Sequence, residues 1–229
     1  MDNNIIQSLQ GKLIVSCQAN EGEPLYGYPL ITQALAKAAI EGGASGIRAN
    51  YPENIASIRE ITRLPILGIY KKEYPDSEVY ITPTMAEAEE IVKAGADIVA
   101  LDGTSRPRPG KETLENLVKQ IRRIYPNILL MADISTEEEG MCCHRLGFDI
   151  IATTLSGYTS YSRQSKTPDY RLVSRLAGKL DVPVIAEGKI STPDQARIMI
   201  EIGAWSVVVG GAITRPQVIT ENYSSALRD

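Results

Sequence analysis

The chain has 229 residues, of which 43% are hydrophobic and 23% charged, and its formal net charge is -4. This length suits one α/β barrel with a sizeable core, and the composition is that of an ordinary globular chain. No Lys/Arg cluster indicates nucleic acid as a partner, and no window is apolar enough to indicate a membrane span.

The N-terminal stretch and the cysteines predict the compartment. Residues 1–9 are polar and carry no targeting pattern. Three cysteines, Cys17, Cys142 and Cys143, cannot all pair within one chain, and a bridge between the two vicinal cysteines is geometrically poor. We therefore expect free thiols and a cytoplasmic location.

A unit of a short apolar run, a polar or glycine-containing loop and an amphipathic helical pattern repeats along the chain. Apolar runs without alternation are typical of parallel strands covered on both faces. The predicted strands are Leu13–Cys17, Ser45–Arg48, Ile66–Tyr70, Ile98–Asp102, Ile128–Ala132, Ile150–Thr154, Val182–Ala186 and Ser206–Val209. The predicted helices are Pro29–Glu41, Asn54–Thr62, Met85–Ala94, Glu112–Ile124, Thr136–Leu146, Tyr170–Leu180, Pro193–Ile202 and Pro216–Leu227.

Start and stop signals support these helices. Hydroxyl residues that suit an N-cap stand at 82–84, 135–136 and 191–193, and glycine follows a helix within 41–45, 93–97, 145–149 and 201–205. Eight alternations predict a single (β/α)8 barrel, a TIM barrel, over residues 1–229. A doubly wound open sheet is the alternative, but it more often has a Gly-rich turn after its first strand, where this chain has Gln18-Ala19-Asn20.

Polar residues recur at the predicted carboxyl ends of the strands, which is where barrels of this type carry their function. They are Gln18, Arg48, Lys71, Asp102, Asp133, Thr153, Thr154, Glu187 and the pair Gly210-Gly211. Most also have an ordinary structural interpretation. Gln18 can cap a strand, Asp102 can start a turn, and Thr153 suits a strand by propensity. Arg48 can form an ion pair with Asp133 or Glu187.

Lys71 and Glu187 indicate acid–base chemistry more strongly. Each follows a short apolar run, so each side chain is expected at the barrel mouth. A partly desolvated lysine can lose its proton near neutral pH and act as a base, and a carboxylate from another strand completes an acid–base pair. A structural Lys–Glu ion pair is the alternative, and Lys72 is the expected surface lysine.

The loops after the seventh and eighth strands predict a phosphate site, as in many barrels. They contain Gly188, Lys189, Gly210, Gly211 and Arg215. Glycine lets backbone N–H groups approach a phosphate, and an arginine adds a bidentate contact. Two ordinary tight turns are the alternative.

Other kinds of site find little support. His144 is the only histidine and stands mid-helix, so we expect it at the surface. Cys142, Cys143 and His144 lack the spacing of a metal site. The carboxylates Asp102, Asp133 and Glu187 stand on separate strands and are not a specific metal signature.

Nine stretches, spread over nearly the whole chain, carry a resemblance to a known family. They are Val-Ser-Cys-Gln-Ala (15–19), Gly-Ile-Arg-Ala-Asn (46–50), Gly-Ile-Tyr-Lys-Lys-Glu-Tyr (68–74), Tyr-Ile-Thr-Pro-Thr (80–84), Leu-Asp-Gly-Thr (101–104), Met-Ala-Asp-Ile-Ser-Thr (131–136), Thr-Thr-Leu-Ser-Gly-Tyr-Thr (153–159), Pro-Val-Ile-Ala-Glu-Gly (183–188) and Val-Val-Gly-Gly-Ala-Ile-Thr-Arg-Pro (208–216). In combination they resemble the N-acetylmannosamine-6-phosphate 2-epimerases, phosphate-binding barrels of bacterial sialic acid catabolism. Lys72 departs from the pattern, because an arginine is common there.

The resemblance implies a role for each candidate residue. Lys71 would remove and return the C2 proton of a phosphorylated amino sugar, and Glu187 would carry protons of its hydroxyl groups. The sugar contacts would be Gln18, Arg48 and Asp133, and the loops after the seventh and eighth strands, with Arg215, would bind the phosphate. Thr153, at the end of the sixth strand, is a further candidate for a sugar contact. No metal or organic cofactor is implied.

The chemistry agrees with these roles, because C2 of the open-chain sugar adjoins the C1 aldehyde and its proton is acidified. Arg48 is a candidate for stabilising the enolate. Two other readings stay open: an aldose–ketose isomerase and a non-catalytic phosphosugar sensor. A homodimer also stays open.

Overall fold

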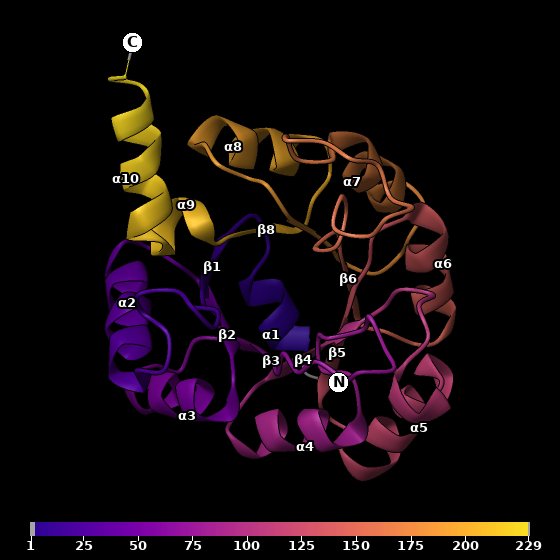
Figure 1. The fold of residues 1–229 in the computed structure, drawn as a ribbon. Coiled ribbons are helices and arrows are strands. Elements are labelled where there is room, and N and C mark those ends of the chain that lie inside the picture. Colours follow the sequence, from indigo (N-terminus) through magenta and orange to yellow (C-terminus); the bar gives the residue numbers. More distant parts are fainter. Residues whose placement is uncertain (1–2, 229) are drawn as a thin grey trace.

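Eight parallel strands pair in chain order and close on themselves, with helices around the outside (Figure 1). The computed structural model describes residues 3–228. The strands are β1 (Leu13–Cys17), β2 (Gly46–Asn50), β3 (Ile66–Ile69), β4 (Ile98–Asp102), β5 (Leu129–Asp133), β6 (Ile150–Ala152), β7 (Val184–Glu187) and β8 (Ser206–Val209). Because β1 pairs with both β2 and β8, the predicted (β/α)8 barrel is confirmed and the open sheet is excluded.

The eight predicted helices all form, with ends that move by at most a few residues. They are α2 (Pro29–Glu41), α3 (Pro52–Ile61), α4 (Met85–Lys93), α5 (Leu114–Ile124), α6 (Glu137–Arg145), α7 (Tyr170–Ala177), α8 (Pro193–Glu201) and α10 (Pro216–Ser225). A 3-10 turn, η1 (Pro109–Lys111), precedes α5.

The predicted start and stop signals act as expected. Thr84 and Thr136 form capping boxes with glutamates three residues later, and Thr192 accepts a hydrogen bond from the Gln195 N–H before α8. Gly43, Gly95, Gly147 and Gly203 follow their helices with positive φ, between 84° and 107°. This left-handed backbone turns the chain back toward the next strand.

The predicted end of the second strand was wrong. The prediction stops at Arg48, whereas β2 continues to Asn50. A charged residue normally marks the end of a buried run, but Arg48 points into the barrel and is neutralised there by carboxylates. Arg48 can therefore be buried, and the strand continues beyond it.

Two short helices were not predicted, α1 (Asn3–Ser8) and α9 (Gly211–Thr214). In Figure 1, α1 is seen through the ring of strands. The Trp205 indole N–H donates to the Ile6 carbonyl at 2.9 Å, and the Gly11 N–H donates to the Trp205 carbonyl at 2.7 Å. Since Trp205 precedes β8, α1 covers the amino ends of the strands and leaves the carboxyl ends open.

Two layers of apolar packing hold the barrel. Side chains such as Ile14, Leu67, Met131 and Ile185 fill its interior together with Leu9. A second and larger cluster lies between the strands and the surrounding helices. The strands are therefore anchored on both faces by close-packed side chains.

Candidate active site

Arg48 is the centre of the polar cluster at the carboxyl ends of the strands. It is only 1% exposed and reaches from β2 to Asp133, the last residue of β5, and Glu187, the last residue of β7. Its Nη1 donates to Asp133 Oδ1 at 3.0 Å and also to Glu187 Oε2, while Nη2 donates to Asp133 Oδ2 at 2.5 Å. Burial alone would lower the pKa of Arg48, but the two carboxylates raise it above its usual value. The arginine therefore stays charged and fixes both acids.

Glu187 stands where a carboxyl group holds its proton more tightly than in water. Burial raises its pKa, the Arg48 charge opposes that rise, and the nearby Asp133 adds to it. Thr153 clamps the backbone of this residue: its hydroxyl donates to the Glu187 carbonyl at 3.0 Å and accepts from the Glu187 N–H at 3.2 Å. This buried position makes Thr153 a support of the predicted acid.

Thr154 has a contact that sequence reasoning missed. Its hydroxyl donates to Asp133 Oδ1 at 2.5 Å and lies 3.2 Å from Glu187 Oε2, and it accepts from Arg48 Nη1 at 3.1 Å. The β-branched pair 153–154 reads as ordinary strand in the sequence, so no signal separates the two threonines before β6 is known to end at Ala152.

Lys71 lies just beyond β3, with its backbone and its amine held by two asparagines. Its N–H donates to Asn50 Oδ1 at 2.9 Å, and its Nζ donates to Asn20 Oδ1 at 3.0 Å. Burial lowers its pKa to about 8, helped by the positive charges of Arg48 and Arg215. An amine with this lowered pKa is neutral far more often near physiological pH than an ordinary lysine, and the neutral form is the one that acts as a base.

The predicted alternative of a Lys71–Glu187 ion pair does not form within residues 3–228. The amine is bonded to a neutral amide, and the carboxylate is bonded to Arg48. A neutral partner does not raise the pKa of an amine as a carboxylate would. The Lys71 amine and the Glu187 carboxylate therefore have different partners, although both lie at the barrel mouth.

Lys72 has different surroundings from its neighbour. Its side chain is 46% exposed, and its Nζ lies 2.9 Å from Glu87 Oε1 and 5.4 Å from the centre of the Tyr74 ring. Hydrogen bonds with Glu87 and Tyr74 raise its pKa above the usual value. The expected surface position of Lys72 is confirmed.

The predicted phosphate loops lie side by side, because Glu187 of β7 is in register with Val208 of β8. Gly188 has a φ of +107°, a left-handed conformation that favours glycine. Gly210 packs tightly, since an added Cβ would lie 3.3 Å from the Ser16 Cβ. Gly211 begins α9, and Arg215 follows it.

The side chains of these loops and of Gln18 have partners within the protein. Lys189 Nζ donates to the Gly157 carbonyl at 3.3 Å and lies 4.9 Å from the centre of the Tyr158 ring. Gln18 Nε2 donates to Ser16 Oγ at 2.7 Å. Arg215 Nε lies 3.1 Å from Glu23 Oε1.

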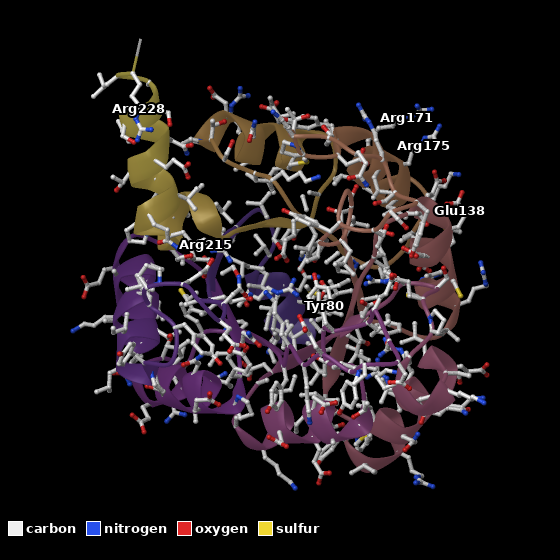
Figure 2. All side chains as sticks on the ribbon, viewed as in Figure 1. Tyr80, Glu138, Arg171, Arg175, Arg215 and Arg228 are labelled. Atoms are coloured by element: carbon white, nitrogen blue, oxygen red, sulfur yellow. The ribbon has the colours of Figure 1, made fainter. Side chains whose placement is uncertain are left out.

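Tyr80 is a residue that sequence reasoning missed. Figure 2 shows it near the centre of the ring of strands, and Arg215 toward the side where α9 and α10 lie. Burial raises the pKa of the Tyr80 hydroxyl, and the negative charges of Asp102 and Asp133 also raise it. Its segment 80–84 belongs to the resemblance, but Tyr80 follows no strand, so position in the repeat gave no signal.

Asp102 faces its own partners at the end of β4. Its Oδ2 lies 2.7 Å from Arg106 Nη2, and its Oδ1 accepts from the Thr104 hydroxyl at 2.6 Å. No three His, Cys, Asp or Glu side chains between residues 3 and 228 are grouped to hold a metal ion. His144 stands in α6, half-buried, 3.4 Å from Asp181.

Comparison with known proteins agrees with this architecture. The solved structure of the N-acetylmannosamine-6-phosphate 2-epimerase from Clostridium perfringens superposes with a TM-score of 0.94, at 46% identity, and covers 99% of this chain and 97% of that one. A thiamine phosphate pyrophosphorylase from Pyrococcus furiosus shares only the fold, with a TM-score of 0.62 at 19% identity over 95% of this chain and 93% of that one.

Relatives in sequence span the whole chain. A protein of Caldanaerobacter subterraneus subsp. tengcongensis named "Putative N-acetylmannosamine-6-phosphate 2-epimerase" is 52% identical over 100% of this chain and 96% of its own length. A Clostridioides difficile protein of the same name is 48% identical over 97% of this chain and 99% of its own. Residues 32–229 match the family described as "Putative N-acetylmannosamine-6-phosphate epimerase", and the chain belongs to that family.

Proposed function

We propose that this protein interconverts N-acetylmannosamine 6-phosphate and N-acetylglucosamine 6-phosphate by removing and returning the proton at C2. The observation that carries the proposal is the environment of Lys71, a lysine at the barrel mouth whose pKa burial lowers to about 8. The names of the relatives point to the same reaction. The enzyme is therefore an isomerase.

The first step is proton transfer from C2 to the neutral amine of Lys71. The C1 aldehyde of the open-chain sugar acidifies this proton, and its removal leaves an enolate whose charge needs stabilisation. Arg48 supplies a fixed positive charge at the mouth. Its donors already bind Asp133 and Glu187, so it also acts by holding those acids in place.

Glu187 carries the protons of the sugar hydroxyl groups. A carboxyl group whose pKa is raised by burial holds a proton more readily than an exposed one and can pass it to a hydroxyl oxygen. Thr153, which clamps the backbone of Glu187, fixes where that proton is delivered. Gln18 and Asp133 contact the remaining polar groups of the sugar.

The phosphate binds at the loops after β7 and β8, where the backbone N–H groups of Gly188, Gly210 and Gly211 would donate to its oxygens. Lys189 and Arg215 add positive charge. Binding energy gained at this remote group positions C2 against Lys71 and so contributes to the rate. An unphosphorylated sugar loses that contribution.

We propose sialic acid degradation in the cytoplasm as the setting. The thiols of Cys17, Cys142 and Cys143 are free, which suits a reducing compartment. No helix in the described part of the chain is long and apolar enough to cross a membrane.

We also propose a homodimer. None of the residues of α10 is buried, Tyr223 is 74% exposed, and Leu227 just beyond the helix is 86% exposed. Figure 1 shows α10 extending away from the ring of strands. Light scattering after gel filtration should give twice the chain mass, and a monomeric mass would refute the homodimer.

Product analysis tests the reaction. The protein should convert N-acetylmannosamine 6-phosphate to N-acetylglucosamine 6-phosphate, and N-acetylmannosamine itself should be a very poor substrate. A ketose product would favour the aldose–ketose isomerase, and binding without turnover would favour the sensor. Equal kcat/KM for the two sugars would contradict the phosphate site.

A further inference from the structure

A chain of contacts joins Arg215 to Lys71 through the loop that follows β1. Arg215 Nε lies 3.1 Å from Glu23 Oε1. Glu23 Oε2 accepts from the Asn20 backbone N–H at 2.7 Å, and Asn20 Oδ1 accepts from Lys71 Nζ at 3.0 Å. Three consecutive contacts thus connect the residue proposed to bind phosphate with the residue proposed to remove the C2 proton.

Glu23 occupies the middle of this chain and uses a different oxygen for each side. The ion pair joins Oε1 to Nε of Arg215, and the two terminal nitrogens of that guanidinium form no hydrogen bond within residues 3–228. These two nitrogens form a planar edge that suits two oxygens of a phosphate. Glu23 therefore orients Arg215 without blocking the edge that would bind the ligand.

Stability alone gives little reason for this ion pair. The Glu23 and Arg215 side chains are 22% and 31% exposed, and ion pairs in such surroundings contribute little to folding. The pair instead joins two loops from opposite ends of the chain. The arrangement is more useful for setting positions than for holding the fold.

We propose that Glu23 is a positioning residue that aims Arg215 at the phosphate of the substrate and, through Asn20, places the Lys71 amine at C2. The inference builds on the proposed function and adds a residue to it. The phosphate on C6 and the proton on C2 belong to one substrate, so their protein partners must keep a fixed separation. A single carboxylate linked to both partners provides it.

The variant Glu23→Gln tests the contact with Arg215 separately from the contact with Asn20. The Asn20 N–H donates to Oε2 of the carboxylate and the Arg215 guanidinium lies beside Oε1 as its charge partner, whereas glutamine is neutral and has only one acceptor oxygen. The variant should keep the shorter contact with Asn20 and lose the contact with Arg215. KM for the phosphorylated sugar should rise about tenfold while kcat stays within about twofold of wild type.

Asn20→Ala removes only the contact with the Lys71 amine. Lys71 loses the acceptor of its amine, so kcat should fall about tenfold with KM nearly unchanged. Adding Arg215→Ala to Glu23→Gln should raise KM no further than Arg215→Ala alone, because both changes remove one interaction. Glu21→Gln, an exposed change of the same charge in the same loop, is the matched control and should match wild type.

Binding of inorganic phosphate, followed by phosphorus NMR, tests the Arg215 end without turnover. Glu23→Gln and Arg215→Ala should weaken it about equally, and Glu21→Gln should not. Thermal unfolding checks that each variant folds, and Glu23→Asp replaces any Glu23→Gln protein that does not. An inactive wild type that shows this phosphate pattern would refute the proposed reaction and leave the aiming of Arg215 standing. Three results would overturn the inference. They are a Glu23→Gln protein that behaves like Glu21→Gln, KM effects of Glu23→Gln and Arg215→Ala that add, and a wild-type protein that does not bind phosphate.

Discussion

At the scale of single residues, two neighbouring lysines offer a direct contrast. The Lys71 amine is partly buried and donates to neutral Asn20, whereas Lys72 is paired with Glu87 near the surface. Lys71→Ala should lower the rate of epimerisation by roughly two to four decades, as the loss of a catalytic base does. Lys72→Ala should change the rate little. Comparable losses in both variants, measured by steady-state kinetics, would refute the assignment of the base.

The buried lysine should also cost stability, in a way that depends on pH. Its pKa is about 8 in the folded protein, and an unfolded lysine titrates near 10.4. Between these values the unfolded chain binds more protons, so wild-type stability rises with pH, and below about 8 the full cost remains. Lys71→Met should therefore unfold at an equal or higher Tm than wild type at pH 7.

The gap between the two proteins should shrink as the pH approaches about 10.4, where the unfolded lysine also becomes neutral. Thermal unfolding across this range measures it. A gap that widens with pH would mean that the amine is not destabilised by burial.

Glu187 distinguishes a catalytic from a structural acid. Glu187→Gln keeps the shape of the side chain but cannot carry a proton. We expect kcat to fall by roughly two to four decades. Tm should change little, because Asp133 still binds Arg48 through both of its oxygens. A near-normal kcat in the folded variant would leave Lys71 to act alone or with another group.

At the scale of elements, the helix α1 closes the end of the barrel opposite the site. Leu9, just after it, is 1% exposed in the interior cluster, so Leu9→Ala should lower the free energy of unfolding by about 2–5 kcal/mol. The fluorescence of Trp205, which is bonded to Ile6, should change with it. Leu30→Ala, at a residue 74% exposed, is the control. A large fall in kcat in the folded Leu9→Ala protein would contradict this separation between the site and the amino end of the barrel.

The elements that the sequence could and could not predict differ for physical reasons. Strands and helices with continuous apolar runs or caps were predictable, because hydrophobic periodicity and capping act locally. The end of β2 was not, because Arg48 is buried only through partners 85 and 139 residues away in the chain. The helix α1 is short, and its position depends on contacts with Trp205 at the far end of the sequence.

The candidate site shows the same division. Strand-end position was enough to select Lys71, Arg48, Asp133 and Glu187, because a barrel brings every strand end to one mouth. The pairing of Arg48 with both acids, and of Lys71 with Asn20, could not be predicted, because it depends on side-chain positions in the folded barrel. Thr154 and Tyr80 carry ordinary residue types, and only their three-dimensional neighbours set them apart.

At the scale of the whole molecule, the barrel separates support from chemistry. Apolar side chains and α1 fill the interior and one end, and charged groups gather at the other. This arrangement lets Lys71 lie near Arg48, Asp133 and Glu187 without bonding directly to an acid. The fold therefore supplies both the lowered pKa of Lys71, the proposed base, and the raised pKa of Glu187, the proposed acid.

Proton NMR of N-acetylmannosamine 6-phosphate with the protein in deuterium oxide tests the central claim most directly. If Lys71 exchanges the C2 proton, the C2 hydrogen signal should disappear from the product as N-acetylglucosamine 6-phosphate forms, and Lys71→Ala should abolish both changes. Formation of the epimer with its original C2 hydrogen retained in full, or undiminished exchange in Lys71→Ala, would contradict the account.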